Sequence, residues 1–448
     1  MASDQATDRG KGTERLKDRG SKERIDLLSG LISRAVIGRG FGDEGKGLAV
    51  DYFCSKVPET LVIKHNGGAQ AGHTVELEGK RFVFHQLASG SFRHSKTLWA
   101  DTYYPDLFKL REEMEAFRDV SGFTPNILCD VNTPVTLIDD VIINMLLESA
   151  RGDARHGSCG MGINEAFERT KAGFRMTVRD FFEKDAKSLV GQMLSIRETY
   201  GKERLRKLGI LTGKKGDQVH LGYIAGATYN QEYLELLESK VVIENAVEEM
   251  QRSADSYVTL AEHMDKVLGE CSEIVFETGQ GLLLDAENQS FAPHVTASRT
   301  GLTNPVCFLR KYGLSLTEAV YVTRTYVTRH GAGPLPYECS REALGIMQAD
   351  ATNVDNPWQG SLRYARHGSV QEFLAPIQED LKENVGKGQR KPGVSLFLTH
   401  LNETNQRLCM KQGNVALDSL RAMPEMKETI DSFYISSSRE AKDVVILR

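Results

Sequence analysis

The chain has 448 residues, 40% hydrophobic and 26% charged, a composition typical of soluble globular proteins rather than of collagen-like, membrane or disordered chains. Its 56 Lys and Arg residues against 61 Asp and Glu residues give a net charge of -5, which argues against nucleic acid or an anionic membrane as the main partner. Seven cysteines without a C-x-x-C pair favour neither disulfides nor a zinc site, so a cytoplasmic protein that acts on small molecules is expected.

The first 33 residues alternate basic and acidic side chains and contain almost no apolar residue before Ile25. Such a segment buries too little apolar surface to fold alone, so it predicts a charged, disordered tail. A basic arm that binds nucleic acid is the alternative, but the acidic residues nearly cancel its charge. Apolar runs such as 141–147 are far shorter than the roughly 20 residues of a membrane-spanning helix, so no membrane partner is expected.

From residue 34 to 448, short apolar runs alternate with helix-like stretches. This rhythm predicts one α/β domain with a large, mainly parallel sheet flanked by helices. The predicted strands are 35–37, 60–63, 127–128, 273–276, 318–322 and 394–398. Between about 178 and 263 the chain is rich in Glu, Lys, Leu and Met and poor in glycine, which predicts an inserted helical subdomain. A separate helical domain is less favoured, because predicted strands lie on both sides.

The first predicted strand runs directly into a glycine-rich turn and the start of a helix. From Gly40 to Lys46 the spacing fits G-x-x-x-x-G-K, in which backbone N–H groups and a lysine cradle phosphate oxygens at a helix N-terminus. Gly47 stands where a Walker loop has Ser or Thr, so the usual hydroxyl ligand of Mg²⁺ is missing. Asp43 could replace it, because Mg²⁺ binds one or two carboxylates together with phosphate oxygens. The segment predicts a P-loop-like nucleotide site.

A second cluster, at 64–74, follows the predicted strand that ends at Ile63. A loop at this place projects side chains at the carboxyl edge of the sheet, where ligands bind in such folds. His73 in this loop could protonate or polarise an oxygen of a reacting group, since the reference pKa of histidine is about 6.5. A structural histidine is the alternative for His73 taken without its neighbours.

These two segments, in this order, resemble the adenylosuccinate synthetase family, whose members have G-D-E-G-K-G followed by N-A-G-H-T. The corresponding stretches here are 42–47 and 70–74. Further matching segments are 157–162, 276–285, 293–298 and 328–336. The resemblance extends from about residue 35 to 340 and continues more weakly to the C-terminus. It implies a homodimer that uses Mg²⁺, a purine nucleoside monophosphate, a nucleoside triphosphate donor and aspartate.

The family reaction implies a chemical role for each catalytic residue. GTP phosphorylates O6 of IMP, and the amino group of aspartate then displaces phosphate at C6. By resemblance, Asp43 takes the N1 proton and also holds Mg²⁺, with the Gly72 carbonyl as a second metal ligand. His73, as a cationic donor, and Gln280, as an amide donor, stabilise charge on O6. Lys46 neutralises the donor phosphates.

The resemblance also implies which residues hold the two nucleotides. The acceptor phosphate faces neutral hydrogen-bond groups, the ribose lies beside the segment from Arg329 to Gly333, and the donor base lies at 399–402. The nucleotide-binding residues are then Gly42, Glu44, Gly45, Gly47, Gln70, Ser158, Cys159, Thr296, Arg329, Gly331, Gly333, Thr399, His400 and Asn402.

The base-reading segment departs from the family pattern. The family has T-K-L-D, in which the aspartate accepts from guanine N1–H and N2–H, whereas this chain has Thr399-His-Leu-Asn402. An amide cannot accept both guanine protons, but it can pair with the adenine edge, whose N1 accepts and whose N6 donates. The donor is therefore open between GTP and ATP or dATP.

The amino-acid pocket departs further. The family has G-R-G where this chain has Met161 between two glycines, and an arginine run where this chain has 359–364. Only Arg363 aligns with a family arginine, whereas Ser361 stands in place of one. A dicarboxylate ligand therefore has fewer planar guanidinium groups to bind. Three other arginines could compensate, namely Arg299, Arg324 and Arg366. A paralogue acting on dGMP or GMP, and a nucleotide sensor without turnover, remain alternatives.

Overall fold

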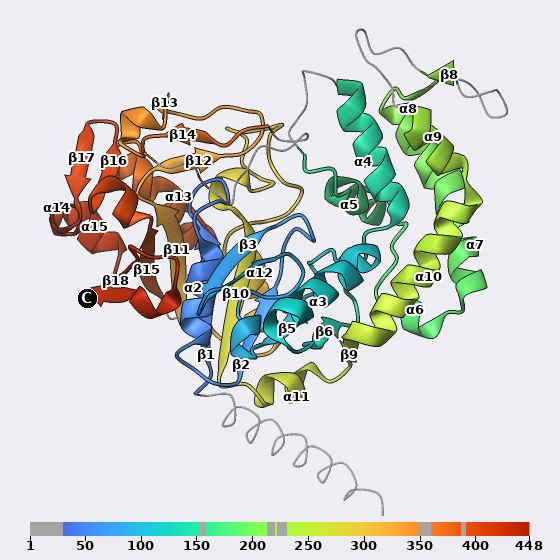
Figure 1. Cartoon of the computed structure of the whole chain (residues 1–448), viewed down its shortest axis with the longest axis horizontal. Coiled ribbons are helices and arrows are strands. Elements are labelled where there is room, and N and C mark those ends of the chain that lie inside the picture. The colour runs from blue at the N-terminus through green and yellow to red at the C-terminus, as the bar shows by residue number, and fades with distance from the viewer. Residues whose placement is uncertain are drawn as a thin grey trace, which may run out of the picture.

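The structure is a computed structural model that describes residues 30–151, 158–212, 220–221, 231–347, 350, 360–386 and 391–447. Residues 1–29 of the predicted tail lie outside these ranges. Figure 1 shows a central sheet with helices on both faces and a lobe of helices at one end. Within the described residues, no helix is both long and apolar enough to cross a membrane.

A ten-stranded sheet forms the centre of the molecule, in the order β19-β18-β15-β11-β1-β10-β2-β5-β6-β9. All neighbouring pairs are parallel except β18 and β19. The strands are β1 (Ile32–Gly38), β2 (Thr60–Lys64), β5 (Lys96–Trp99), β6 (Ile127–Asp130), β9 (Val258–Ala261), β10 (Glu273–Gly281), β11 (Glu318–Arg324), β15 (Gly393–Thr399), β18 (Ser432–Ile435) and β19 (Val445–Leu447). The predicted large, mainly parallel sheet and all six predicted strands are confirmed.

Both faces of the sheet are buried, which explains why its strands have continuous apolar runs. In β1, Ala35 and Ile37 pack into one apolar cluster, whereas Val36 packs into another with helix α2 on the opposite face. Side chains alternate between the two faces of a strand, so each face needs its own helical cover. The covering helices are α2 (Lys46–Cys54), α3 (Leu107–Ser121), α11 (Met264–Gly269), α12 (Thr303–Lys311), α13 (Val370–Asn384), α14 (Leu417–Ala422) and α15 (Pro424–Thr429).

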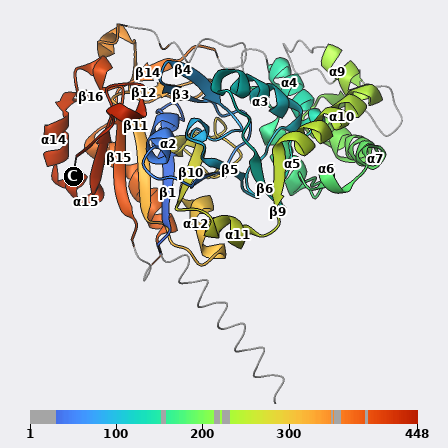
Figure 2. The same cartoon turned by 60° about the horizontal axis from the view of Figure 1, so that its bottom comes forward.

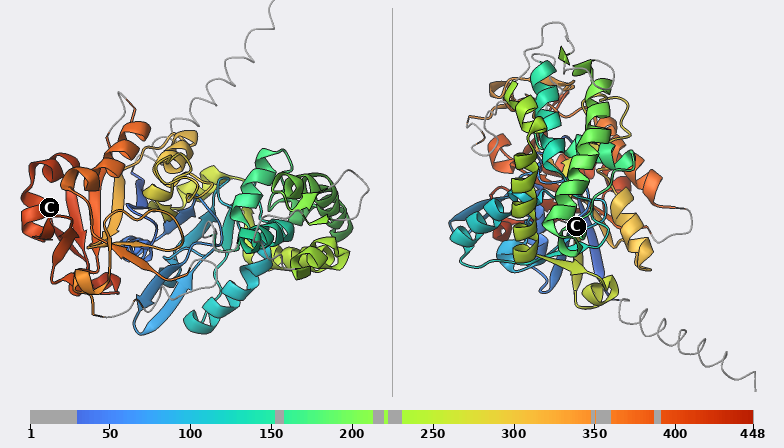
Figure 3. Two further views of the ribbon diagram at one scale, coloured as in Figure 1. Left: turned by 90° about the horizontal axis from the view of Figure 1, so that it is seen from above. Right: turned by 90° about the vertical axis from the view of Figure 1, so that its right-hand side faces the viewer.

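The helical lobe lies beyond the β6–β9 end of the sheet, as Figures 1 and 3 show. Its helices are α4 (Ile138–Arg151), α5 (Ile163–Lys171), α6 (Asp180–Glu183), α7 (Ala186–Ile196), α8 (Lys202–Lys207), α9 (Gln231–Glu238) and α10 (Lys240–Tyr257). The interval 178–263 is thus largely helical. It also contains β9, which joins the main sheet, and the lobe already begins at α4, because α4 packs against α9 in one apolar cluster. Treating the lobe as an inserted subdomain remains a prediction.

Small sheets surround the central one. They consist of β3 (His73–Leu77) with β4 (Lys80–Phe84), β7 (Leu211–Thr212) with β8 (His220–Leu221), β12 (Val327–Arg329) and β13 (Glu338–Cys339) with β14 (Arg363–Ala365), and β16 (Arg407–Met410) with β17 (Gly413–Ala416). In Figure 2 the β3–β4 hairpin lies at the end of the sheet where β1 meets α2.

Five adjacent strands direct their following loops to one edge of the sheet. The strands β15, β11, β1, β10 and β2 are neighbours and parallel, so their carboxyl ends lie together. This edge brings together the glycine loop after β1, the loop after β2 and the turn after β15, which are far apart in the sequence.

Candidate active site

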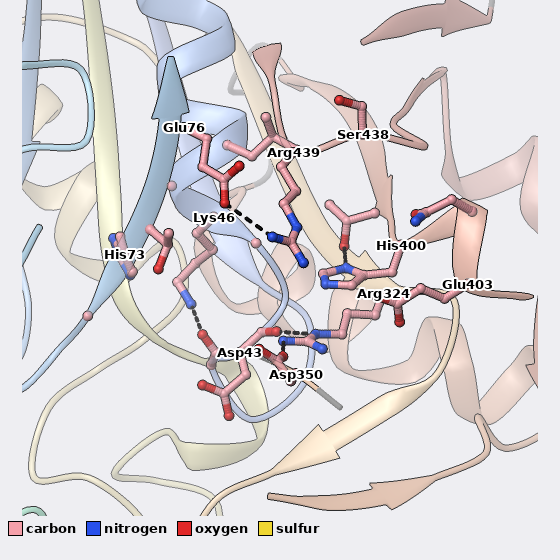
Figure 4. Close-up of a pocket in the computed structure, with 18 residues that line it drawn as sticks. Asp43, Lys46, His73, Glu76, Arg324, Asp350, His400, Glu403, Ser438 and Arg439 are labelled. Carbon is pink, nitrogen blue, oxygen red and sulfur yellow. Dashed lines mark hydrogen bonds and ion pairs between the residues drawn. The ribbon is translucent and has the colours of Figure 1, made fainter. Parts of the chain in front are cut away.

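One cavity lies at this edge of the sheet, and Figure 4 shows its side chains. Its lining combines the glycine loop, the start of β3, the ends of β11 and β15, and the segment after β18. The lining residues are Gly42, Asp43, Gly45, Lys46, Gly47, Leu48, Gly72, His73, Thr74, Glu76, Arg324, Asp350, Thr399, His400, Asn402, Glu403, Ser438 and Arg439. The structure therefore brings together the residues predicted for the donor nucleotide with three of the predicted catalytic residues and the carbonyl predicted for a metal.

One side chain of the glycine loop accepts hydrogen bonds from the backbone of the same loop. The Glu44 carboxylate accepts hydrogen bonds from the N–H groups of Gly40 and Gly42, at 2.9 and 2.8 Å. These two N–H groups therefore already have an anionic acceptor inside the protein. Glu44 thus stabilises the loop from within, and a phosphate contact of the Gly42 N–H remains a prediction.

The N–H groups available for a phosphate lie at the start of helix α2. Gly45 precedes this helix with a φ of 91°, a conformation that favours glycine. The first helical N–H with a partner in the helix is that of Ala49, 3.4 Å from the carbonyl oxygen of Gly45. No described residue accepts from the N–H groups at 46–48, which belong to the first turn, and their residues line the cavity. The positive end of the helix dipole favours an anion there.

Lys46 is held in a fixed position although it is only 1% exposed. Its Nζ donates to the carbonyl oxygen of Gly42 at 2.6 Å and lies 3.4 Å from Glu44 Oε2. A buried ammonium needs such partners. It has three donor protons, so one remains for a phosphate oxygen of the donor.

Asp43 lies at the turn of the loop and lines the cavity, where Figure 4 shows it near Lys46 and Arg324. Its backbone carbonyl accepts from Arg324 Nε at 2.5 Å, whereas no described residue donates a hydrogen bond to its carboxylate. Burial raises the pKa of Asp43, and the charges of His330 and Arg324 partly oppose that rise. A carboxylate with a raised pKa is a stronger proton acceptor than an ordinary aspartate.

His73 is oriented by a buried carboxylate that the sequence analysis did not identify. Its Nδ1 lies 2.5 Å from Glu277 Oε1, and Ser89 donates to the same carboxylate from its N–H and its hydroxyl. Burial raises the pKa of a carboxyl group, but the Lys64 ammonium and the hydrogen bonds from His73 and Ser89 outweigh it, so the pKa of Glu277 is below its usual range. Because a carboxylate only accepts, Nδ1 of His73 carries the proton.

The opposite ring nitrogen of His73, Nε2, is buried and has no partner among the described residues. Burial lowers the pKa of His73, and the Glu277 carboxylate opposes part of that effect. The imidazole is therefore neutral at rest and presents an unprotonated Nε2. The predicted cationic donor forms only when His73 gains a proton, which negative charge on a ligand would favour.

The amide of Gln280 has a defined orientation. The backbone N–H of Gly279 can only donate, and it donates to Asn66 Oδ1 at 2.9 Å. Asn66 Nδ2 therefore faces Gln280 Oε1, at 3.0 Å. This chain of hydrogen bonds leaves the Nε2 protons of Gln280 as the free donors, as its predicted role requires.

The residues predicted for the acceptor phosphate gather around the loop after β2. A side chain added at Gly67 would lie 2.8 Å from Gln70 Nε2 and 3.0 Å from Gln280 Nε2, so both amides border this glycine. Thr296 Oγ1 lies 3.5 Å from Ser298 Oγ, which in turn lies 3.5 Å from Asn66 Nδ2. Gln70 and Thr296 thus lie near Gln280 and Asn66, around the loop after β2.

Ser158 and Cys159 belong to the segment that leads into helix α5 of the helical lobe. Ser158 Oγ lies 3.1 Å from Asn144 Nδ2 of α4. Ile163, which begins α5, contacts the position where a side chain at Gly68 would lie, so this segment packs on the loop. Burial raises the pKa of Cys159 to about 11, so its thiol is uncharged at neutral pH and does not repel a phosphate.

Arg329 shapes the segment that follows it. It is 2% exposed, and its two terminal nitrogens donate to the carbonyl oxygens of Pro334 and His294 at 2.6 and 3.0 Å. Its guanidinium also lies over the Phe41 ring, 4.5 Å from the centroid. Its carbonyl partners fix the turn that contains Gly331 and Gly333, whose φ values are 77° and 102°. The contact with ribose remains a prediction for all three.

The segment after β15 forms the other end of the cavity. Thr399 Oγ1 donates to the carbonyl oxygen of Glu44 at 2.8 Å, which joins this segment to the glycine loop. His400 Nδ1 lies 2.8 Å from Thr399 Oγ1, and His400 has a φ of 60°, unusual for a residue other than glycine. Burial and the charge of Arg324 lower the pKa of His400 well below its usual value. Asn402 is exposed and lines the cavity.

Comparison with known proteins assigns this arrangement to a family. The family model described as adenylosuccinate synthetase matches residues 35–356. The chain belongs to the adenylosuccinate synthetase family. Its likeness to that family is confirmed, and so are the predicted classes of nucleoside triphosphate-dependent C–N ligase and purine biosynthesis, at the level of the family.

Curated relatives named adenylosuccinate synthetase are distant. The chain is 28% identical over 329 residues to the protein of Bdellovibrio bacteriovorus, which covers 72% of this chain and 68% of the relative. It is 28% identical over 312 residues to that of Pseudomonas aeruginosa and 30% identical over 319 residues to that of Tolumonas auensis. These matches cover 68% of this chain and 64% and 65% of the two relatives, so the matched segment spans about two thirds of the relatives' length.

Two solved structures share the fold. The fully ligated adenylosuccinate synthetase of Plasmodium falciparum has a TM-score of 0.65 at 14% identity, covering 93% of this chain and 99% of its own. The cyanophage S-2L succinoaminodeoxyadenylate synthetase, bound to dGMP and to dATP as an energy donor, has a TM-score of 0.55 at 16% identity, covering 93% and 95%. At these identities the likeness shows the fold.

The arginine expected to bind the amino acid of this family member is already paired. Arg363 on β14 makes a two-pronged ion pair with Glu338 and donates to the carbonyl oxygens of Gly331 and Gly333. Ser361 is exposed nearby, and Gln359 lies outside the described residues. The amino-acid role of Arg363 and Ser361 therefore remains a prediction, and it requires Arg363 to exchange Glu338 for a ligand.

The other arginines considered as substitutes are placed differently. Arg299 pairs with Asp285 and Glu383, and Arg366 donates to Asn414 and to a backbone carbonyl. Only Arg324 among these three lines the cavity. Met161 takes part in a small apolar cluster with Ile163 on the helical lobe.

The cavity residues fit a magnesium ion of the kind the family uses. Asp43 and Gly72 line the same cavity as Lys46, so the residues predicted to supply a carboxylate and a backbone carbonyl border the place expected for donor phosphates. Mg²⁺ typically takes one or two carboxylates, with phosphate oxygens and water completing its six ligands. No cluster of three or more His, Cys, Asp or Glu ligands occurs in the described part of the chain. A site shared with the substrate therefore suits these residues.

Several polar residues of the site were missed from the sequence, because their roles depend on contacts between distant segments. These residues are Asn66, Glu277 and Glu403, and Arg324 was considered only as a substitute arginine for the amino-acid pocket. One signal was present for Glu277, a charged residue directly after the apolar run 274–276 of a buried strand. Such a residue needs a partner in the fold.

Proposed function

We propose that the chain joins the amino group of aspartate to C6 of a 6-oxopurine nucleotide, with hydrolysis of a nucleoside triphosphate. The observation that carries this proposal is a single cavity that holds Asp43 and His73 beside Lys46 and the free N–H groups of helix α2. A proton acceptor, an O6 partner and a phosphate site lie together there, as two-step phosphoryl and amino transfer requires.

In the first step, Asp43 takes the proton from N1 of the acceptor, so that O6 gains negative charge and attacks the terminal phosphorus of the donor. The bond between that phosphorus and the leaving diphosphate oxygen breaks. Lys46 and the N–H groups at 46–48 hold the phosphates in place, and Mg²⁺, bound with Asp43 and Gly72, would neutralise phosphate charge when present.

In the second step, the amino group of aspartate attacks C6 and the O6–phosphate group leaves. Nε2 of His73, protonated at this stage, and the Nε2 protons of Gln280 stabilise the charge on O6. Glu277 holds His73 so that Nε2 faces the cavity and compensates its positive charge. The products are a succinylamino purine nucleotide, a nucleoside diphosphate and phosphate.

The identities of the donor base and of the acceptor base are proposed separately from the reaction. Asn402 stands where the family has its guanine-reading aspartate, which favours an adenine donor such as ATP or dATP. The cyanophage relative, which shares the fold, is bound to dGMP and dATP. We therefore propose, as the alternative, a specialised enzyme that acts on dGMP or GMP. We also propose that the enzyme is a homodimer, which sedimentation of the purified chain would test.

A matrix of substrates tests the proposal. Each of IMP, dIMP, GMP and dGMP is supplied with aspartate, Mg²⁺ and each of GTP, ATP and dATP, and products are identified by mass spectrometry. Product with the mass of a succinylamino nucleotide in any well supports the ligase, and the well identifies the acceptor. Nucleotide binding without phosphate release in every well would instead indicate a nucleotide sensor.

A further inference from the structure

Two consecutive carbonyl groups of the catalytic loop are anchored from outside the loop. The carbonyl oxygen of Asp43 accepts from Arg324 Nε at 2.5 Å, and that of Glu44 accepts from Thr399 Oγ1 at 2.8 Å. A peptide unit is planar and trans, so fixing a carbonyl also fixes the N–H of the next residue. These two contacts therefore set the direction of the backbone on both sides of Glu44, and with it the place of the Asp43 carboxylate.

Arg324 has every nitrogen of its guanidinium committed within the protein. Besides Asp43, it donates from Nη1 to the Tyr326 hydroxyl at 3.1 Å and from Nη2 to Asp350 Oδ2 at 2.8 Å. Its side chain is 5% exposed. Three acceptors in three directions suit a planar fork with three separate nitrogens, whereas an ammonium carries all its donors on one nitrogen. Each guanidinium nitrogen of Arg324 thus already has a partner in the protein, although the residue lines the cavity.

The same network continues to the far end of the cavity. The Tyr326 hydroxyl has one proton, and it lies 2.5 Å from Glu403 Oε2, which can only accept from it. Glu403 belongs to the short 3-10 turn Leu401–Thr404, which also contains Asn402. A buried path of hydrogen bonds thus joins the turn beside the donor base to the backbone of Asp43.

We propose that Arg324 is a positioning residue that holds the Asp43 loop in its reactive geometry and ties it to the 401–404 turn. The proposal rests on the proposed function, because Asp43 is its reacting group. Arg324 acts through the Asp43 backbone and not by contact with substrate. A misplacement of a catalytic group by about 1 Å can cost about 100-fold in rate, so loss of this anchor lowers turnover more than it lowers affinity.

The test compares Arg324→Lys, which keeps the charge but loses the fork, with Tyr326→Phe, which removes only the link to Glu403. The matched control is Arg197→Lys in the helical lobe. Arg197 is 8% exposed and makes a two-pronged ion pair with Asp139 outside the cavity. For each variant, kcat, the KM of the donor, the thermal midpoint and amide hydrogen exchange of residues 40–46 are measured.

We expect Arg324→Lys to lower kcat by about tenfold or more while the donor KM changes by less than about threefold, and Tyr326→Phe to lower kcat by about threefold. Amides at 40–46 should exchange faster in Arg324→Lys, whereas Arg197→Lys should leave both kcat and this exchange unchanged. An unchanged kcat and unchanged exchange would overturn the proposal, and so would a raised KM with unchanged kcat. A parent chain without turnover would refute the proposed function, whereas the exchange of 40–46 would still test the anchor.

Discussion

The catalytic side of the cavity and the predicted amino-acid side, around Arg363, differ in how far their charged side chains are buried. At the catalytic side, Lys46 and His73 are 1% and 4% exposed, and buried partners hold both. At the amino-acid side, Arg363 pairs with Glu338 near the surface, with side chains 29% and 45% exposed. An interior charge must be paired and is therefore fixed, whereas a surface ion pair contributes only about 0–1 kcal/mol and exchanges partners readily.

We therefore expect changes of substrate to arise at the accessible residues rather than at the buried ones. Residues that move protons or hold phosphates are fixed by contacts that a substitution would leave unpaired. The residues predicted to choose the base and the amino acid are more accessible, because Asn402 is exposed and Arg363 is partly exposed. Substitutions on the catalytic side should therefore have larger effects than substitutions on the amino-acid side.

The largest effect is expected at the centre of the catalytic side. Asp43→Asn keeps the shape of the loop but removes the proton acceptor and a metal ligand. Turnover should fall by at least about 100-fold, the scale of general acid–base catalysis. The thermal midpoint should barely change, since no described residue donates a hydrogen bond to this carboxylate. Steady-state kinetics measure the effect, and a rate comparable to that of the parent would remove Asp43 from the mechanism.

A somewhat smaller loss is expected when the partner of His73 is altered. Glu277→Gln removes the charge that orients the imidazole and stabilises its protonated form, so kcat should fall by about 10- to 100-fold. The matched control is Asp380→Asn. Asp380 is a buried carboxylate that accepts from Leu302 N–H and the Tyr321 hydroxyl outside the cavity. If both variants lost stability equally and neither lost turnover per folded molecule, Glu277 would be only structural.

Asn402→Asp tests the exposed base-reading end. A carboxylate can accept from two guanine N–H groups, whereas the amide leaves one unpaired at a cost of about 1 to 3 kcal/mol. Restoring the carboxylate should shift the ratio of kcat/KM toward GTP over ATP by roughly tenfold or more. The same acceptor is used for parent and variant. A parent that already prefers GTP strongly, or an unmoved ratio, would show that Asn402 does not read the base.

The smallest effect is expected at the amino-acid side. Glu338→Gln removes the charged partner of Arg363 and leaves its guanidinium available to a carboxylate ligand. The KM for aspartate should fall by about threefold, the size of a surface ion-pair term of roughly 0.7 kcal/mol. The control is Glu338→Gln combined with Arg363→Gln, in which the gain should vanish. A KM that stays the same in the single variant would place amino-acid binding elsewhere.

The sequence was sufficient for the central sheet because its strands are buried on both faces. Six strands with continuous apolar runs were predicted and are present. Strands β5, β9, β18 and β19 were not predicted, because they are short and include polar residues such as Lys96 and Thr259. Their pairing depends on neighbouring strands rather than on their own sequence.

For the site, the motifs were enough to place Asp43, Lys46, His73 and 399–402 in one cavity. Their supporting contacts were not predictable. Glu44 closes the glycine loop upon itself, and Arg324 reaches the carbonyl of Asp43 across 281 positions of sequence. Such contacts have no local pattern, because any polar side chain of suitable length could make them.

Phosphorylation of the acceptor's O6, and the departure of this oxygen as phosphate, can be tested directly. The acceptor that is active in the substrate matrix is prepared with ¹⁸O at O6 and incubated with aspartate, Mg²⁺ and unlabelled donor. Mass spectrometry then measures the isotope content of the released phosphate. We expect one ¹⁸O atom in each phosphate released with product. Unlabelled phosphate formed together with product would contradict it.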